Sequence, residues 1–169
     1  NKGLVYPFNF DMKVTYRLDA EGLSQEYDIV NTDTKNMPYT FCLHSAFVEP
    51  ESFTLPVCKR QEHDEIDIPT GRYLELNEQE RGYVTGSPSK GLEIVGYYEA
   101  TGHTSRVGDF LYTVSDNFDY WILYNGRGVS GFLCLEPQAG KVNGLNIDDG
   151  YKLLTPGESV RYTTRYTHI

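Results

Sequence analysis

One histidine and one glutamate in this sequence have the setting that proton transfer requires. His44 lies within the extended segment Tyr39–Phe47, where two-residue alternation puts it on the more polar side, with Cys42. An imidazole titrates near pH ~6.5, so His44 can be protonated at modest cost and can serve as a proton donor. The alternative is a structural histidine that donates to a backbone carbonyl.

Glu136 closes an apolar run, Gly131–Leu135, and is followed by Pro137, which holds it extended. Partial burial at such a position would raise its pKa from the usual value near ~4.3 and make the carboxylate a better base at neutral pH. The alternative is a solvated strand end. Glu136 and His44 are therefore our candidates for a general base and a general acid.

Other chemistries lack their usual motifs. Cys42, Cys58 and Cys134 are too widely spaced for a zinc or redox motif. The acidic clusters show no EF-hand spacing, and no Gly-x-Ser-x-Gly elbow is present. Gly126–Gly128 is typical of a hairpin turn and has no strand–loop–helix phosphate cradle around it. We therefore expect neither a metal nor another cofactor.

Composition excludes several classes of partner. A chain of 169 residues fits a single domain over residues 1–169. Its net charge of −9 repels nucleic acid, and its longest basic cluster is only Lys59-Arg60. No stretch approaches the ~20 apolar residues of a membrane span, and no signal-peptide pattern is present. Together with an odd number of cysteines, these features predict a cytoplasmic protein that binds neither membranes nor nucleic acid.

The elements that position the two candidate residues are strands. The 14 tyrosines, with Thr, Val and Phe, favour pleated sheets. Lys13–Asp19 and Leu23–Val30 alternate with period two around a turn that ends at Gly22, which predicts a hairpin. One short helix is expected around Asn77–Arg81. Further strands are predicted at Ser52–Val57, Leu92–Ala100, Arg106–Ser115, Tyr120–Tyr124, Ser130–Glu136 and Ser159–Thr167. Short strands separated by Gly and Pro turns indicate an all-β, antiparallel sandwich.

Several stretches, taken in order, resemble the aldose 1-epimerase (galactose mutarotase-like) family. They cover nearly the whole chain: Tyr6-Pro7-Phe8, Val14–Leu18 with Gly22-Leu23, Met37-Pro38 through Phe47, Leu135–Gln138, and Leu153–Ser159. The Glu-Pro-Gln sequence at Glu136 is more typical of the divergent bacterial branch of that family. The resemblance implies a large antiparallel β-sandwich that interconverts the α and β anomers of a free sugar without a cofactor.

The resemblance also implies roles for single residues. The histidine that matches His44 protonates the sugar ring oxygen, and the glutamate that matches Glu136 takes the proton from the anomeric hydroxyl. Gln138 is our candidate sugar contact, with capping of the strand end as its alternative. The partner expected on this basis is a small-molecule sugar.

Two features of the family have no counterpart in this sequence. Family members usually have a preceding sheet region that supplies a second histidine and an arginine, so we expect this chain to be the C-terminal part of a longer epimerase. The family's sugar-binding aspartate also has no match, because Asp116-Asn117-Phe118 lies too close to Glu136.

Two other functions fit parts of the sequence. A non-catalytic carbohydrate-binding sandwich would stack sugars on aromatic side chains such as Trp121 and Tyr124. A sugar-phosphate 1-epimerase would need a basic pocket, for which Arg72, Arg81 and Arg106 are available, although nothing in the sequence gathers them.

Overall fold

The computed structural model describes residues 6–65, 68–128 and 131–169. Ser130, the first residue of one predicted strand, lies outside the described residues. Among the described residues, no helix is long and apolar enough to cross a membrane.

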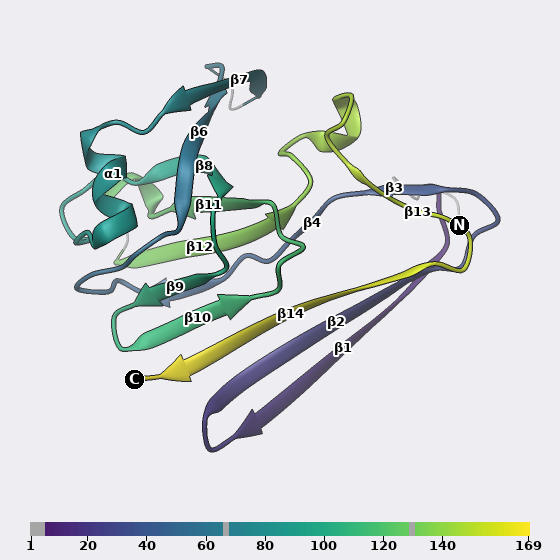
Figure 1. Cartoon of the computed structure of the whole chain (residues 1–169), viewed down its shortest axis with the longest axis horizontal. Helices are drawn as coiled ribbons and strands as arrows, with labels where there is room; N and C mark the ends of the chain where they lie inside the picture. The colour runs from purple at the N-terminus through teal and green to yellow at the C-terminus, as the bar shows by residue number, and fades with distance from the viewer. Residues whose placement is uncertain (1–5, 66–67, 129–130) are drawn as a thin grey trace.

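Two antiparallel sheets form the molecule (Figure 1), as predicted for an all-β sandwich. The five-stranded sheet has the order β1-β2-β14-β10-β9, with bounds Phe10–Asp19, Gly22–Asn31, Ser159–His168, Phe110–Val114 and Thr104–Val107. The seven-stranded sheet has the order β4-β12-β11-β8-β6-β7, with bounds Phe41–Cys42, Phe132–Ala139, Tyr120–Tyr124, Val95–Ala100, Val57–His63 and Pro69–Glu75. In that sheet β5 (Ala46–Val48) also pairs with β12. A small separate sheet joins β3 (Met37–Tyr39) to β13 (Lys152–Leu154), and two 3₁₀ segments occur, η1 (Gly126–Gly128) and η2 (Gly144–Asn146).

The core lies between the two large sheets and is rich in aromatic rings. Tyr112 of β10 packs on Trp121 of β11 with a ring-centroid distance of 5.9 Å, and on Phe47 of β5 at 5.5 Å. Phe118 and Tyr162 of β14 approach to 4.8 Å. The two Tyr112 contacts join residues of opposite sheets, so they fix the position of β11 and β5 relative to the five-stranded sheet.

The predicted N-terminal hairpin is present as β1 and β2. Its last turn residue, Gly22, has φ +141°, and a Cβ atom there would lie 1.9 Å from the Tyr166 carbonyl oxygen. Glycine is therefore required at this position by both conformation and space. Figure 1 shows β1, β2 and β14 extending away from the seven-stranded sheet. β1 accordingly leaves large apolar side chains exposed, among them Tyr16 and Leu18.

The predicted helix is also present, as α1 (Glu78–Thr85). Asn77 is its N-cap: the Asn77 side chain accepts from the Glu80 backbone N–H, and the Glu80 side chain accepts from the Asn77 N–H. This reciprocal capping box explains why a helix begins here in an otherwise β-rich chain.

Four of the strand predictions were wrong in part. Within Ser52–Val57 only Val57 belongs to a strand, β6, while Phe53 forms isolated bridges to Ser87 and Val107. The strand predicted at Leu92–Ala100 is shorter and begins at Val95, as β8. Arg106–Ser115 is two strands, β9 and β10, since Gly108 turns the chain at φ +58°. The strand predicted to end at Glu136 continues as β12 to Ala139, despite Pro137.

Candidate active site

Strand β12 presents alternate residues to opposite sides of the seven-stranded sheet. Leu133 and Leu135 are fully buried in the core, so Cys134, Glu136 and Gln138 face the other side. Cys42 stands opposite Gln138, and Ala46 stands opposite Cys134. Continuing this register places His44, which lies between β4 and β5, directly opposite Glu136.

Pro137 explains why the strand opposite β12 is interrupted at His44. The Leu43 N–H donates to the Pro137 carbonyl at 3.2 Å, but proline has no N–H to return the bond. The Leu43 carbonyl accepts instead from the Ser45 N–H at 3.0 Å, which closes a tight turn around His44. Beyond the turn, Ser45 resumes pairing by accepting from the Leu135 N–H at 2.9 Å. The His44 side chain is left 70% exposed at the apex of this turn.

The two predicted proton-transfer residues meet at this point. His44 Nε2 lies 3.3 Å from Glu136 Oε1, although the two residues come from distant parts of the sequence. The Glu136 side chain is only 11% exposed. Burial raises the pKa of Glu136 above its ordinary value, opposed by the nearby His44 and by a hydrogen bond from the Cys42 thiol. A carboxylate of raised pKa beside an exposed imidazole is suited to paired proton transfer.

Gln138 is buried within β12, on the same side of the sheet as Glu136. It stands opposite Tyr120 of β11 and Cys42 of β4. Since two residues along a strand span about 6.6 Å, its amide is near enough to Glu136 to contact the same small molecule. β12 continues beyond it to Ala139, so Gln138 does not cap the strand end.

A polar cavity of about 420 Å³ lies beside Tyr120, the β11 partner of Gln138, and no sequence motif predicted it. Tyr120, opposite Gln138, lines the cavity together with Glu99, its own partner on β8. Further lining residues include His103, Asp116, Asp119, Asp149, Tyr151 and Lys152. Asp119 is held in place, because its carboxylate accepts from Lys152 Nζ at 2.8 Å and from the Gly140 N–H at 2.9 Å.

The aromatic residues considered for sugar stacking do not form a platform. Trp121 is 1% exposed in the core, and its indole N–H donates to the Gly102 carbonyl at 3.1 Å. Tyr124 is 38% exposed and packs on Phe132. Trp121 points inward because it alternates with Tyr120 and Ile122, which take the outer side. The proposal of Trp121 as a stacking residue was therefore wrong.

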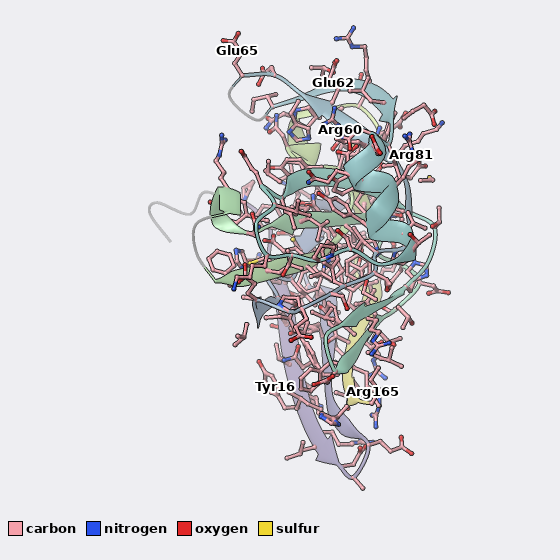
Figure 2. The ribbon with its side chains drawn as sticks, turned by 90° about the vertical axis from the view of Figure 1, so that its left-hand side faces the viewer. Tyr16, Arg60, Glu62, Glu65, Arg81 and Arg165 are labelled. Carbon is pink, nitrogen blue, oxygen red and sulfur yellow. The ribbon has the colours of Figure 1, made fainter. Side chains whose placement is uncertain are left out.

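The arginines considered for phosphate binding are dispersed. Arg72 binds Glu62 at 2.6 Å, Arg81 donates to the Leu76 carbonyl, and Arg106 donates to the Gly108 carbonyl. Figure 2 shows Arg81, a residue of α1, near Arg60, whereas Arg165 lies near Tyr16 at the opposite end of the molecule. Arg72, Arg81 and Arg106 therefore each have a local partner away from the His44–Glu136 pair.

Comparison with solved structures shows the same fold in sugar-related proteins. A galactose mutarotase-like protein from Clostridium acetobutylicum superposes with a TM-score of 0.88 at 21% identity, covering 98% of this chain and 59% of that one. A putative aldose 1-epimerase from Escherichia coli K12 gives 0.79 at 16% identity, covering 96% of this chain and 62% of that one. Galactose 1-epimerase from Lactobacillus acidophilus superposes with a TM-score of 0.71 at 16% identity, covering 96% of this chain and 57% of that one.

The chain thus spans about three fifths of the length of these structures. The family model for aldose 1-epimerase matches residues 1–167, nearly the whole sequence. With the antiparallel sandwich and the register that sets His44 against Glu136, this match shows that the chain belongs to the aldose 1-epimerase family.

Proposed function

We propose that this chain carries the acid/base pair of an aldose 1-epimerase and interconverts the α and β anomers of a hexose. The observation that supports this most strongly is the 3.3 Å contact between His44 Nε2 and Glu136 Oε1. Opening a cyclic hemiacetal requires a proton to be added at the ring oxygen while another leaves the anomeric hydroxyl. These two oxygens are bonded to the same carbon, so the donor and the acceptor must lie close together, as these two groups do.

The proposed reaction uses only these two side chains. Protonated His44 donates to the ring oxygen while Glu136 accepts the proton of the anomeric hydroxyl, and the bond from the anomeric carbon to the ring oxygen breaks. The open-chain aldehyde then rotates about its C1–C2 bond. Ring closure runs the transfers in reverse, with neutral His44 as base and protonated Glu136 as acid, and releases the other anomer. The exposed His44 ring has the freedom to move aside for the sugar, whereas the buried Glu136 is fixed.

The polar cavity beside Gln138 supports an uncharged sugar as substrate. Four carboxylates line it, from Glu99, Asp116, Asp119 and Asp149, against two lysines, Lys141 and Lys152, of which Lys152 is paired with Asp119. Carboxylates accept hydrogen bonds from sugar hydroxyls but repel a phosphate group. We therefore favour a free hexose over a sugar phosphate, with Gln138 contacting hydroxyls close to the reacting carbon.

Two further parts of the proposal concern the protein as a whole. The two sheets share one core of buried rings, which supports a single domain. Cys42, Cys58 and Cys134 are free thiols, which supports a cytoplasmic location.

Polarimetry on freshly dissolved α-D-glucose or α-D-galactose tests the proposal. Glu136→Gln and His44→Asn should each slow catalysed mutarotation by ~10²–10⁴-fold, since each removes one positioned proton-transfer group. Glu75→Gln and His168→Asn, both at exposed positions, are the matched controls and should keep the wild-type rate. Equal rates for wild type and Glu136→Gln, with both proteins folded by circular dichroism, would refute the assignment.

A further inference from the structure

The acid/base pair has a third neighbour with different chemistry, the thiol of Cys134. Cys134 Sγ lies 3.9 Å from His44 Nδ1, and Cys134 is fully buried two residues before Glu136 on the same side of β12. One ligand atom from each of His44, Cys134 and Glu136 lies within 4.8 Å of the other two. The proposed proton-transfer mechanism makes no use of this thiol.

The three groups lie near enough to one another for small side-chain rotations to bring them to the spacing of a metal-binding set. Zinc bonds of ~2.3 Å to sulfur and ~2.0–2.2 Å to nitrogen and oxygen place tetrahedral ligands roughly 3.3–3.7 Å apart. His44 supplies one nitrogen to an ion: Nε2 lies 3.3 Å from Glu136 Oε1, whereas the 3.9 Å contact with Cys134 Sγ is made by Nδ1. Binding therefore requires the exposed His44 ring to rotate until one nitrogen faces both the carboxylate and the thiol. Imidazole and thiolate favour zinc and similar borderline ions over magnesium or calcium.

We propose that a borderline divalent cation, of which Zn²⁺ is the type, binds between His44, Cys134 and Glu136 and inhibits the enzyme. Three protein ligands leave the fourth tetrahedral position to water or to a sugar hydroxyl. The bound ion occupies the lone pairs of His44 and Glu136 that proton transfer requires, so it competes with the reaction and does not assist it. The inhibitory effect rests on the proposed function, whereas the binding does not.

Proton release accompanies binding, because only the thiolate form of Cys134 is a ligand. The thiol proton leaves to solvent as the sulfur–metal bond forms.

Cobalt(II) is a direct probe, because cobalt–thiolate bonds give a near-ultraviolet charge-transfer band. Titration of the wild-type chain with Co²⁺ should produce this band with one ion per chain, and Zn²⁺ should abolish it by displacement. Cys134→Ser should lose the band, and Cys58→Ser, at an exposed thiol on β6, should keep it. His44→Asn, at an exposed side chain that folding does not need, should weaken Co²⁺ binding by at least tenfold.

Activity measurements separate the two proposals. Zn²⁺, but not Mg²⁺, should inhibit wild-type mutarotation, and Cys134→Ser should retain activity while becoming at least tenfold less sensitive to Zn²⁺. A band that survives in Cys134→Ser, or one that disappears in Cys58→Ser, would overturn the metal site. A Cys134-dependent band in a chain without mutarotase activity would uphold the metal site and refute the proposed function. Mutarotase activity without any band would uphold the proposed function and refute the metal site.

Discussion

The hydroxyl of Ser45 lies 2.7 Å from the hydroxyl of Tyr112, a residue of the opposite sheet. Tyr166 donates to the same Ser45 oxygen at 3.3 Å. Ser45 directly follows His44, so these bonds tie the turn that presents the candidate acid to two core tyrosines. The position of His44 is thus set by the packing of the sandwich as well as by its own strand.

Tyr112→Phe should reduce both stability and mutarotation. The loss of one hydrogen bond at a fully buried position should cost about 1 kcal/mol, measured by urea unfolding. Because the turn at His44 loosens, kcat should also fall, by more than in a control of equal chemistry. Tyr39→Phe is that control, since it removes a buried hydroxyl bonded to Tyr162 at 3.0 Å. Equal kcat values in the two variants would exclude the positioning role.

Pro137→Ala should lower activity without lowering stability. The new N–H can donate to the Leu43 carbonyl, which now accepts from Ser45, so the tight turn at His44 should relax toward a regular strand. Amide hydrogen exchange would detect the new protected amide at position 137 and lost protection at Ser45. Full activity together with an unchanged Ser45 amide would contradict this role of Pro137.

The stability of Glu136→Gln relative to wild type should depend on pH. Burial raises the pKa of Glu136 in the folded state above its ordinary value of 4.5, so the folded state binds this proton more tightly than the unfolded state. The resulting stabilisation is fully present below pH 4.5 and is lost as pH rises through the folded-state pKa. Glutamine does not titrate, so the free energy of unfolding of the variant should rise relative to that of wild type between pH 4 and pH 8. A difference in unfolding free energy between the two proteins that stays constant across this range would rule out a raised pKa of Glu136.

The raised pKa of Glu136 should also appear in the pH dependence of the reaction rate. Glu136 must be ionised to act as base, so kcat/KM for wild type should decline on the acid side with a midpoint above 4.5. Sugars do not ionise in this range, which makes the acid limb a property of the enzyme. Polarimetric rates between pH 4 and pH 8 provide the measurement, and a midpoint at or below 4.5 would argue against Glu136 as the base.

Trp121→Ala should destabilise the fold by about 3–5 kcal/mol, because it removes a large side chain that is 1% exposed between the sheets. Tyr124→Ala, at a half-exposed position of the same strand, should cost much less. Trp121 is the single tryptophan, so its fluorescence reports unfolding cleanly in the wild type. Strong quenching of native Trp121 emission by iodide would show that this packing is wrong.

Local signals in the sequence were sufficient for much of the architecture. Period-two alternation predicted the β1–β2 hairpin, because a hairpin depends on neighbouring residues, and strand β11 and the short helix α1 were also predicted near their observed positions. The strand at Ser52–Val57 failed because pairing is decided by partners elsewhere in the chain. β12 was predicted to end at Glu136, before Pro137. It continues to Ala139, because the N–H that proline lacks would have faced Leu43, whose carbonyl accepts from Ser45 instead.

By itself, the sequence determined that His44 and Glu136 were the residues to consider, through their types, their strand settings and the resemblance of the motifs around them to the aldose 1-epimerase family. Tertiary structure alone decided that they meet, since the register between β12 and the β4–β5 segment sets them opposite one another. It also placed Cys134 beside them and assembled the polar cavity next to Gln138 from widely separated segments. Contacts between distant residues depend on sheet pairing and core packing, which no local pattern of side chains specifies.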